Sequence, residues 1–365
     1  MAKKNSVNVV EKLGEGLKSL SLPLLSIISA LILGAFVIIA MGLNPISAYQ
    51  NLIKGSLGSV NSIGETLVKT TPLLFTGLSY ALARRCGLFN LGAEGQLYMG
   101  GFFASVVGIY IKGLPIFIHL PLALIAGFIG GGLWGLLAGW LKLRFGASEL
   151  ITTIMLNYIA THWVSYLVTG PMKEPPGDFP QSAQMEITAQ LPRIIPGTRL
   201  HLGLIVALLG VVFFYWFLWK TTIGYEVRVV GENPEAARYA GMNIPRNALM
   251  AMFIAGGFAG LAGSSEILGV QHRLFQNFSP NYGFDGIAVA LLGQNAPIGI
   301  LLSAILFGIL RSGANMMQMA AKVPIAVIYI IQALVIMFVV GSNIFNIFMK
   351  KRSTLAPAKG GKVEC

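Results

Sequence analysis

Two carboxylates lie beside glycines at the start of apolar runs, where a charge is costly to place. Glu94 lies among the glycines of residues 89–96, and Asp285 among those of residues 282–286. A charged side chain within a bilayer costs about 2.5–3.5 kcal/mol on insertion scales, so such residues are seldom accidental. Glycine-interrupted segments often mark broken helices near the substrate site of a transporter. A functional interpretation places these acids near the substrate site or makes them the coupling acids of an ion-driven carrier.

A structural role would account for the same two acids. Each would then lie at a membrane edge and cap a helix N-terminus, where the helix dipole favours negative charge. The basic residues available to pair with them are Arg84, Arg85 and Arg273. The sequence leaves the functional and structural interpretations open.

A polar stripe runs along one segment that is otherwise apolar. Its members recur at every fourth position, which places them on one face of a helix. They are Glu149, Thr153, Asn157 and Thr161. The stripe should face other helices or a water-filled path, and the sequence does not separate these two roles. The candidate residues of the path are Asn90, Glu94, Gln96, Glu149, Thr153, Asn157 and Asp285.

Several other chemistries lack the residues they need. No G-x-x-x-x-G-K-[ST] motif is present, so the chain has no loop to cradle ATP phosphates. The histidines are scattered, without an H-E-x-x-H motif or a Cys/His cluster. Two cysteines, Cys86 and Cys365, imply no disulfide framework. We expect no catalytic residues, no metal site and no cofactor in this chain.

A short helix with clear boundaries is predicted within residues 231–241. Asn233 suits the N-cap, Pro234 the first helical position and Glu235 the positive end of the helix dipole. Gly241 can adopt the left-handed conformation that ends a helix. About two turns are too short to be stable alone in water, so another surface must hold them. A helix of this kind suits a partner that pushes on a transporter.

The chain that positions these residues is strongly apolar. Of its 365 residues, 55% are hydrophobic and 11% charged, and the mean hydropathy is +0.72. A spanning helix needs about 20 apolar residues, and charge-free runs such as 19–53 and 323–349 reach that length. The run 286–310 is interrupted at residues 293–297 and is predicted as one or two elements. We predict an all-α polytopic bundle of about ten spans, some short or broken, with roughly eight or nine as alternatives.

The formal charge of +12 is distributed as in a membrane protein. Most lysines and arginines fall on the side that holds the N-terminus, which follows the positive-inside rule. Both termini and the capped helix are then cytoplasmic, and no nucleic-acid partner is implied. The predicted parts are a basic arm (1–20), a membrane domain (21–349) with an extended outer loop (171–199) and an inner loop (221–246), and a polar tail (350–365).

Three motifs together resemble one transporter family. They are Leu88-Phe89-Asn90-Leu91-Gly92-Ala93-Glu94-Gly95-Gln96, Glu149-Leu150-Ile151-Thr152-Thr153-Ile154-Met155-Leu156-Asn157 and Val230-Gly231-Glu232-Asn233-Pro234-Glu235-Ala236-Ala237. The pattern is similar to the permeases of bacterial ABC importers for ribose-type sugars, branched-chain amino acids and nucleosides. Within that family it resembles the nucleoside (simple-sugar-like) branch, whose binding proteins are basic membrane lipoproteins. Ser148 departs from the pattern, since relatives commonly carry Asn there.

This resemblance implies a transport subunit, not an enzyme, in the plasma (inner) membrane of a bacterium. A separate ATPase with two nucleotide-binding domains would bind ATP and Mg. A second homologous permease chain would complete a heterodimeric pore, and a substrate-binding lipoprotein would deliver a nucleoside. The capped segment would be the coupling helix that docks on the ATPase. Its residues are Glu232, Asn233, Pro234, Glu235, Ala236, Ala237, Arg238 and Gly241.

Two alternatives remain open at this point. Within the same family, ribose or another simple sugar would be the substrate. Outside it, a proton- or sodium-driven secondary transporter would use Glu94 and Asp285 as coupling acids.

Overall fold

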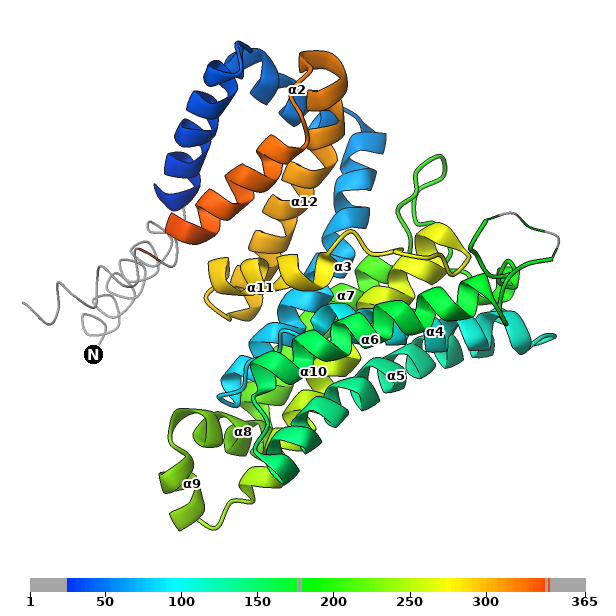
Figure 1. Ribbon diagram of the computed structural model, residues 1–365, viewed down its shortest axis with the longest axis vertical. Helices are drawn as coiled ribbons and strands as arrows, with labels where there is room; N and C mark the ends of the chain where they lie inside the picture. The colour runs from blue at the N-terminus through cyan, green and yellow to red at the C-terminus, as the bar shows by residue number, and fades with distance from the viewer. Residues whose placement is uncertain (1–24, 176, 178, 339–340, 342–365) are drawn as a thin grey trace, which may run out of the picture. The chain divides into compact units, whose positions relative to one another are not determined.

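The computed structural model describes residues 25–175, 177, 179–338 and 341 (Figure 1). Within these residues the regular structure is helical, and strand-like pairing is limited to isolated bridges such as that of Lys173 with Ser182. The predicted all-α class is therefore confirmed. The predicted arm (1–20), the predicted tail (350–365) and Cys365 lie outside the described residues.

The chain divides into two compact units. The larger unit, Tyr49–Ala321, contains all the candidate functional residues. The smaller unit is formed by the segments before and after it, and its described parts include the apolar helices Leu25–Ala40 and Ala326–Phe338. The charge-free run 19–53 is not one helix, because the backbone breaks after Ala40.

From residue 45 to residue 321 the described chain consists of helices joined mostly by short connections. They are α2 (Pro45–Leu57), α3 (Val60–Arg85), α4 (Ala93–Tyr110), α5 (Ile116–Phe145), α6 (Glu149–Thr169), η1 (Ile187–Ala189), α7 (Gly203–Lys220), α8 (Thr222–Glu232), α9 (Pro234–Tyr239), α10 (Ile244–Glu266), η2 (Ile267–Gln271), α11 (Tyr282–Leu292) and α12 (Pro297–Ala321).

Four helices of the described chain are long and apolar enough to cross a membrane. They are α5, α7, α12 and the continuous helix Ile244–Gln271 formed by α10 and η2. Helices α3, α4 and α6 have 26, 18 and 21 residues, which gives them lengths of about 39, 27 and 32 Å. They carry more polar side chains than those four helices, and α3 and α4 are mostly buried within the larger unit. The chain is a membrane protein, and the count of about ten spans stays a prediction.

Helix α10 packs against α3, α4 and α5 in the larger unit (Figure 1). Small residues let the backbones meet: a Cβ on Gly131 of α5 would lie 2.6 Å from the Cα of Gly260 in α10. A side chain on Gly100 of α4 would collide with the same Gly260 backbone. In lipid, close approach of this kind supplies much of the packing between helices.

The interrupted run 286–310 forms two helices. Helix α11 ends at Leu292 and α12 begins at Pro297, and Gln294 and Asn295 between them both have φ of +53°. Helix α12 continues beyond the apolar run, through the buried Arg311, to Ala321. Of the two predictions for this run, one element or two, the structure confirms two.

In its described residues the predicted outer loop, 171–199, combines extended backbone and isolated bridges with several turns and the short helix η1, so the expected extended structure is only partly present. It is bound to the segment that leads into α11. The N–H of Ser182 donates to the carbonyl of Leu274 at 2.9 Å, and Glu174 pairs with Arg273. Arg273 therefore does not pair with Glu94 or Asp285.

Candidate functional site

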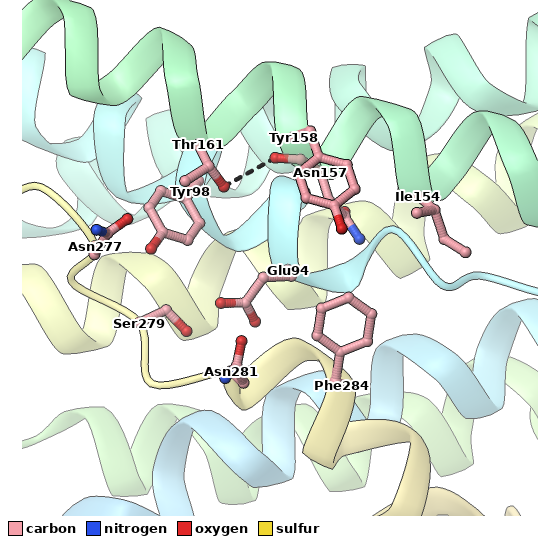
Figure 2. Close-up of a pocket in the computed structure, with 10 residues that line it drawn as sticks. All are labelled: Glu94, Tyr98, Ile154, Asn157, Tyr158, Thr161, Asn277, Ser279, Asn281 and Phe284. Carbon is pink, nitrogen blue, oxygen red and sulfur yellow. Dashed lines mark hydrogen bonds between the residues drawn. The ribbon is translucent and has the colours of Figure 1, made fainter.

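The two glycine-flanked acidic segments meet where α4 and α11 begin (Figure 2). Glu94, in the first turn of α4, accepts a hydrogen bond at Oε2 from the N–H of Gly283 in α11, with an N–O distance of 2.6 Å. A side chain at Gly283 would collide with the backbone of Glu94. Two helix N-termini, each with a partial positive charge, therefore converge on one buried carboxylate.

A cavity of about 400 Å³ lies beside this carboxylate. Figure 2 shows Glu94 between side chains of α6 and the residues that lead into α11. The cavity is lined by Glu94, Tyr98, Ile154, Asn157, Tyr158, Thr161, Asn277, Ser279, Asn281 and Phe284. We refer to it below as the Glu94 cavity.

The lining suits a small molecule that has a flat ring and several polar groups. Tyr98, Tyr158 and Phe284 supply aromatic surface against which a ring can stack. Glu94 supplies a strong hydrogen-bond acceptor, and asparagines supply both donors and acceptors. Recognition sites for small molecules combine apolar walls with a few placed polar groups in this way.

Of the predicted path residues, the structure brings Glu94 and Asn157 to the cavity. The amide of Asn157 also joins two helices: Oδ1 accepts from the N–H of Gly95 and Nδ2 donates to the carbonyl of Leu91, each at 2.8 Å. Asn157 therefore forms interhelical hydrogen bonds, one of the two roles that the sequence left open for the stripe, and it also lines the cavity. Thr161, the last member of the stripe, lines the cavity too.

Asn90 and Gln96 lie away from the cavity lining and brace the connection between α3 and α4. Their amides exchange two hydrogen bonds of 2.9 Å, and Nδ2 of Asn90 also contacts Ser79 Oγ at 3.2 Å. Both side chains are buried. The pair fixes the loop from which Glu94 emerges.

The other two stripe residues, Glu149 and Thr153, are bonded near the start of α6. The Thr153 hydroxyl donates to the carbonyl of Glu149 at 2.6 Å, and the Glu149 carboxylate lies 2.9 Å from Lys142 Nζ of α5. Neither residue lines the Glu94 cavity.

Asp285 pairs with a residue that the sequence reasoning overlooked. Its Oδ2 lies 2.6 Å from Nη2 of Arg311 in α12, and the same Nη2 donates to the carbonyl of Pro280 at 2.7 Å. The guanidinium also lies 4.7 Å from the ring centroid of Tyr282. Arg84, Arg85 and Arg273, the partners that the structural interpretation offered for Asp285, are the wrong ones, because α12 brings Arg311 to the first turn of α11. An arginine inside an otherwise apolar helix was the signal that could have revealed it.

The remaining cavity residues gave little signal in the sequence. Tyr98 and Tyr158 look like ordinary packing or interface aromatics. Asn277 and Asn281 lie in a loop and both have left-handed φ, at +53° and +65°, a conformation asparagine tolerates. Only the path of this loop across α4 and α6 makes them cavity residues.

The predicted capped helix is present as α9. Asn233 is its N-cap, with Oδ1 accepting from the N–H of Ala236 at 3.0 Å, Pro234 is at N1, and Gly241 has φ of +76°. The predicted inner loop 221–246 is mostly helical, however, because α8 fills residues 222–232 and only Asn233 separates it from α9. Tyr239, at the end of α9, is 91% exposed.

Helix α8 connects α9 to the bundle. A Cβ on Gly231 would collide with the carbonyl of Arg85 at the end of α3. Asn247 near the start of α10 donates to Glu226 of α8 at 2.9 Å. Helix α8, next to α9 in the chain, therefore contacts both α3 and α10 (Figure 1).

Comparison with known proteins gives the family. Residues 62–340 match the family described as branched-chain amino acid transport system / permease component. The chain belongs to this family of permeases. The resemblance that the three motifs indicate is therefore confirmed.

Three relatives resemble the permease over nearly its whole length. The guanosine ABC transporter permease protein NupP of Bacillus subtilis is 42% identical, over 92% of this chain and 97% of its own. The glucose ABC transporter permease protein TsgB13 of Haloferax volcanii is 37% identical, over 92% of each chain. The nucleoside ABC transporter permease protein NupB of Lactococcus lactis is 34% identical, over 93% of this chain and 96% of its own.

Each of these organisms supplies a second, more distant match whose name gives the same substrate. These are NupQ of Bacillus subtilis and NupC of Lactococcus lactis, each 27% identical over 68% of this chain, and TsgC13 of Haloferax volcanii, named for glucose and 27% identical over 72%. No solved structure matches the permease. The protein is thus the permease component of an ABC transporter.

Proposed function

We propose that this permease carries nucleosides into the cell across a bacterial plasma (inner) membrane, driven by a separate ATPase. The observation that supports this most directly is the Glu94 cavity, which combines aromatic faces, a carboxylate and amides. A nucleoside has the matching parts, a flat base and a ribose rich in hydroxyl groups. Relatives named for guanosine and for nucleosides, at 42% and 34% identity, support the same substrate class.

In this proposal the cavity belongs to the translocation path. Helix α11 has 11 residues, about 16 Å, so it covers only part of a bilayer and begins within it. Short or broken helices of transporters place their N-termini at the substrate site in this manner. Glu94 and Asn157 would contact the substrate, whereas Asn90, Gln96, Glu149, Thr153 and Asp285 would hold the elements around it.

Helix α9 would be the coupling helix, docked on the ATPase. Residues 232–241 form a short projection that is exposed except at Ala237, and the Tyr239 side chain at its end is 91% exposed. Closure of the ATP sites would move α9 and α8 together, and the contacts of α8 with α3 and α10 would rock the bundle between its two states. ATP and Mg would bind to the partner, and this chain would hold no cofactor.

A second, homologous permease chain would complete the pore. Pairs such as NupP with NupQ and NupB with NupC support a heterodimer, since each pair shares one organism and one named substrate. A substrate-binding lipoprotein would deliver the nucleoside from outside. In this arrangement the membrane domain has about ten spans, with both termini and α9 in the cytoplasm.

A simple sugar is the second candidate substrate, because a relative named for glucose is 37% identical. Aromatic and carboxylate groups also bind sugars, so the cavity alone does not separate the two classes. The ion-driven carrier finds no support, since the relatives are ABC permeases and Asp285 is paired with Arg311.

The test is uptake of labelled guanosine, uridine and glucose in cells with and without this gene. We expect guanosine and uridine uptake to fall in the deletion strain, and excess unlabelled nucleoside, but not ribose, to compete in the parent. Loss of glucose uptake with unchanged nucleoside uptake would assign the sugar instead. Glu235→Ala and Arg238→Ala variants should reach the membrane yet fail to restore uptake. Normal uptake in both variants would refute the coupling role of α9.

A further inference from the structure

Three arginines surround a second cavity, at the end of the larger unit that carries α8 and α9. The cavity has a volume of about 290 Å³ and is formed by three separate elements. They are the end of α3 with Arg84 and Arg85, helix α8 with Arg228, and the connection between α11 and α12 with Gln294 and Asn295. We call it the arginine cavity.

The positive charge of this cavity is not balanced within the described chain. Glu232 is the one carboxylate among the lining residues that the structure describes. The ion pairs of the described residues include none of Arg84, Arg85 and Arg228. Three like charges in a partly buried space repel one another, so an anion placed between them would be stabilised.

Two of the guanidinium groups keep buried donors for a further acceptor. Nη2 of Arg85 donates to the carbonyl of Asn295 at 3.1 Å. Nε of Arg85 and Nε of Arg228 are buried and have no hydrogen-bond partner in the described part of the chain. A buried donor without a partner costs about 1–3 kcal/mol, and more when it is charged. A bound anion would remove that cost.

Trp219, the penultimate residue of α7, holds the same two arginines together. The guanidinium carbons of Arg85 and Arg228 lie 5.4 and 5.8 Å from the centre of its ring. Contact with the ring face offsets part of the repulsion between two cations. It also orients two planar donor groups toward one space, which is how arginines recognise oxyanions.

We propose that Arg84, Arg85 and Arg228 form a binding site for a phosphate group. Guanidinium groups match phosphate oxygens in pairs, and three of them around one cavity suit a charge larger than that of a single carboxylate. The phosphate could be supplied by an anionic phospholipid headgroup or by a free phosphate ion. Basic cavities between membrane helices on the cytoplasmic side bind headgroups, and interfacial tryptophans such as Trp219 lie at headgroup level.

A bound phosphate would connect α8, the helix that leads into α9, to two other elements. It would bridge α8 to the end of α3 and to the α11–α12 connection. This inference goes beyond the proposed function, since it concerns binding and needs no nucleoside, ATPase or uptake. Failure of one can therefore be distinguished from failure of the other.

The test uses the purified full-length permease. Native mass spectrometry would measure retained phosphatidylglycerol, with phosphatidylcholine as the neutral comparison. In a separate experiment, inorganic phosphate would be titrated at constant ionic strength while tryptophan fluorescence is recorded. The contribution of Trp219 is the difference in emission between the wild type and Trp219→Phe. We expect retention of phosphatidylglycerol, or the phosphate-dependent emission change, to weaken about tenfold or more in Arg85→Gln/Arg228→Gln. The matched control is Arg144→Gln/Arg246→Gln, which removes two exposed arginines outside the cavity.

Each outcome decides the proposal. Selective retention of phosphatidylglycerol identifies a headgroup site, and an emission change with inorganic phosphate identifies a free-anion site. Equal effects of the cavity and control variants would overturn the proposal, because they would show only a response to net charge. If the double variant does not fold, Arg228→Lys keeps the charge and loses the planar fork, and should bind more weakly. Absence of both signals in the wild type would also overturn it.

Discussion

Glu94 and Gly283 are separated by 189 residues in the chain, yet the carboxylate of one accepts a hydrogen bond from the N–H of the other at 2.6 Å. This bond joins the first turns of α4 and α11 beside a cavity. It depends on a glycine, because the backbone of Glu94 occupies the place of a Cβ at residue 283. The relationship explains why an acid and a glycine lie at the start of two distant apolar segments.

Replacement of Glu94 tests its place in the path. Glu94→Ala removes both the bond to Gly283 and the acceptor in the cavity, whereas Glu94→Gln keeps a neutral acceptor. A hydrogen bond to a charged group contributes about 1.5–3 kcal/mol, so we expect uptake by Glu94→Ala to fall about 10- to 100-fold. Glu94→Gln should fall less. The control is Glu186→Ala in the outer loop, and equal uptake by all three variants and the wild type would remove Glu94 from the path.

A methyl group at position 283 should separate the two helix starts. In Gly283→Ala the new Cβ would collide with the backbone of Glu94, which a side-chain rotation cannot relieve. We expect a lower melting temperature of the purified permease and loss of uptake. Gly42→Ala is unsuitable as a control because its φ is positive, whereas at Gly341 no atom of the described residues lies within 4 Å of an added Cβ, so Gly341→Ala should leave both unchanged. Wild-type melting of Gly283→Ala would contradict the close contact.

The Asp285–Arg311 pair predicts that removing one partner destabilises the permease more than removing both. Asp285→Asn leaves the Arg311 guanidinium buried without its counter-charge, which costs about 3–5 kcal/mol. Replacing both residues, in Asp285→Asn/Arg311→Gln, should recover part of that loss, because no unpaired charge remains. Thermal unfolding of the two single variants and the double variant would measure the coupling. Strict additivity of the single effects would show that the pair contributes nothing.

Tyr239 should act in assembly and contribute little to the fold. Its side chain is 91% exposed at the end of α9, and exposed aromatic residues on a projection often anchor an interface. We expect Tyr239→Ala to weaken co-purification of the ATPase while the melting temperature of the permease alone stays unchanged. The comparison is Tyr225→Ala, an exposed tyrosine of α8. Full retention of the ATPase by Tyr239→Ala would exclude Tyr239 as an anchor.

The N-cap of α9 allows a separate test of local order. Asn233→Ala removes the Oδ1 that accepts from the N–H of Ala236, and loss of such a cap costs about 0.5–2 kcal/mol. Amide hydrogens of α9 should then exchange faster in the permease alone, while those of α10 keep their protection. Unchanged exchange in α9 would show that the cap does not support the helix. The Asn233→Asp variant, which keeps an acceptor, is the matched control.

Local structure could be predicted from the sequence wherever it depends only on residues within the same segment. Asn233, Pro234 and Gly241 set the ends of α9, because caps and turns depend on neighbouring residues only. The recurrence of polar residues at every fourth position from Glu149 to Thr161 correctly predicted that they share one helix, α6. The interruption at residues 293–297 likewise marked the boundary of α11 and α12.

Three motifs in order also indicated the family, and the family match over residues 62–340 confirms it. The partners of the buried charges were decided by the tertiary structure alone. Arg311 reaches Asp285, and Gly283 reaches Glu94, only because α11 and α12 pack against α3. Periodicity shows which face of a helix is polar, but not which distant face it meets. Which faces meet depends on where glycines allow two backbones to come into contact. The contact of Gly283 with Glu94 is one such place, and the Glu94 cavity lies beside it.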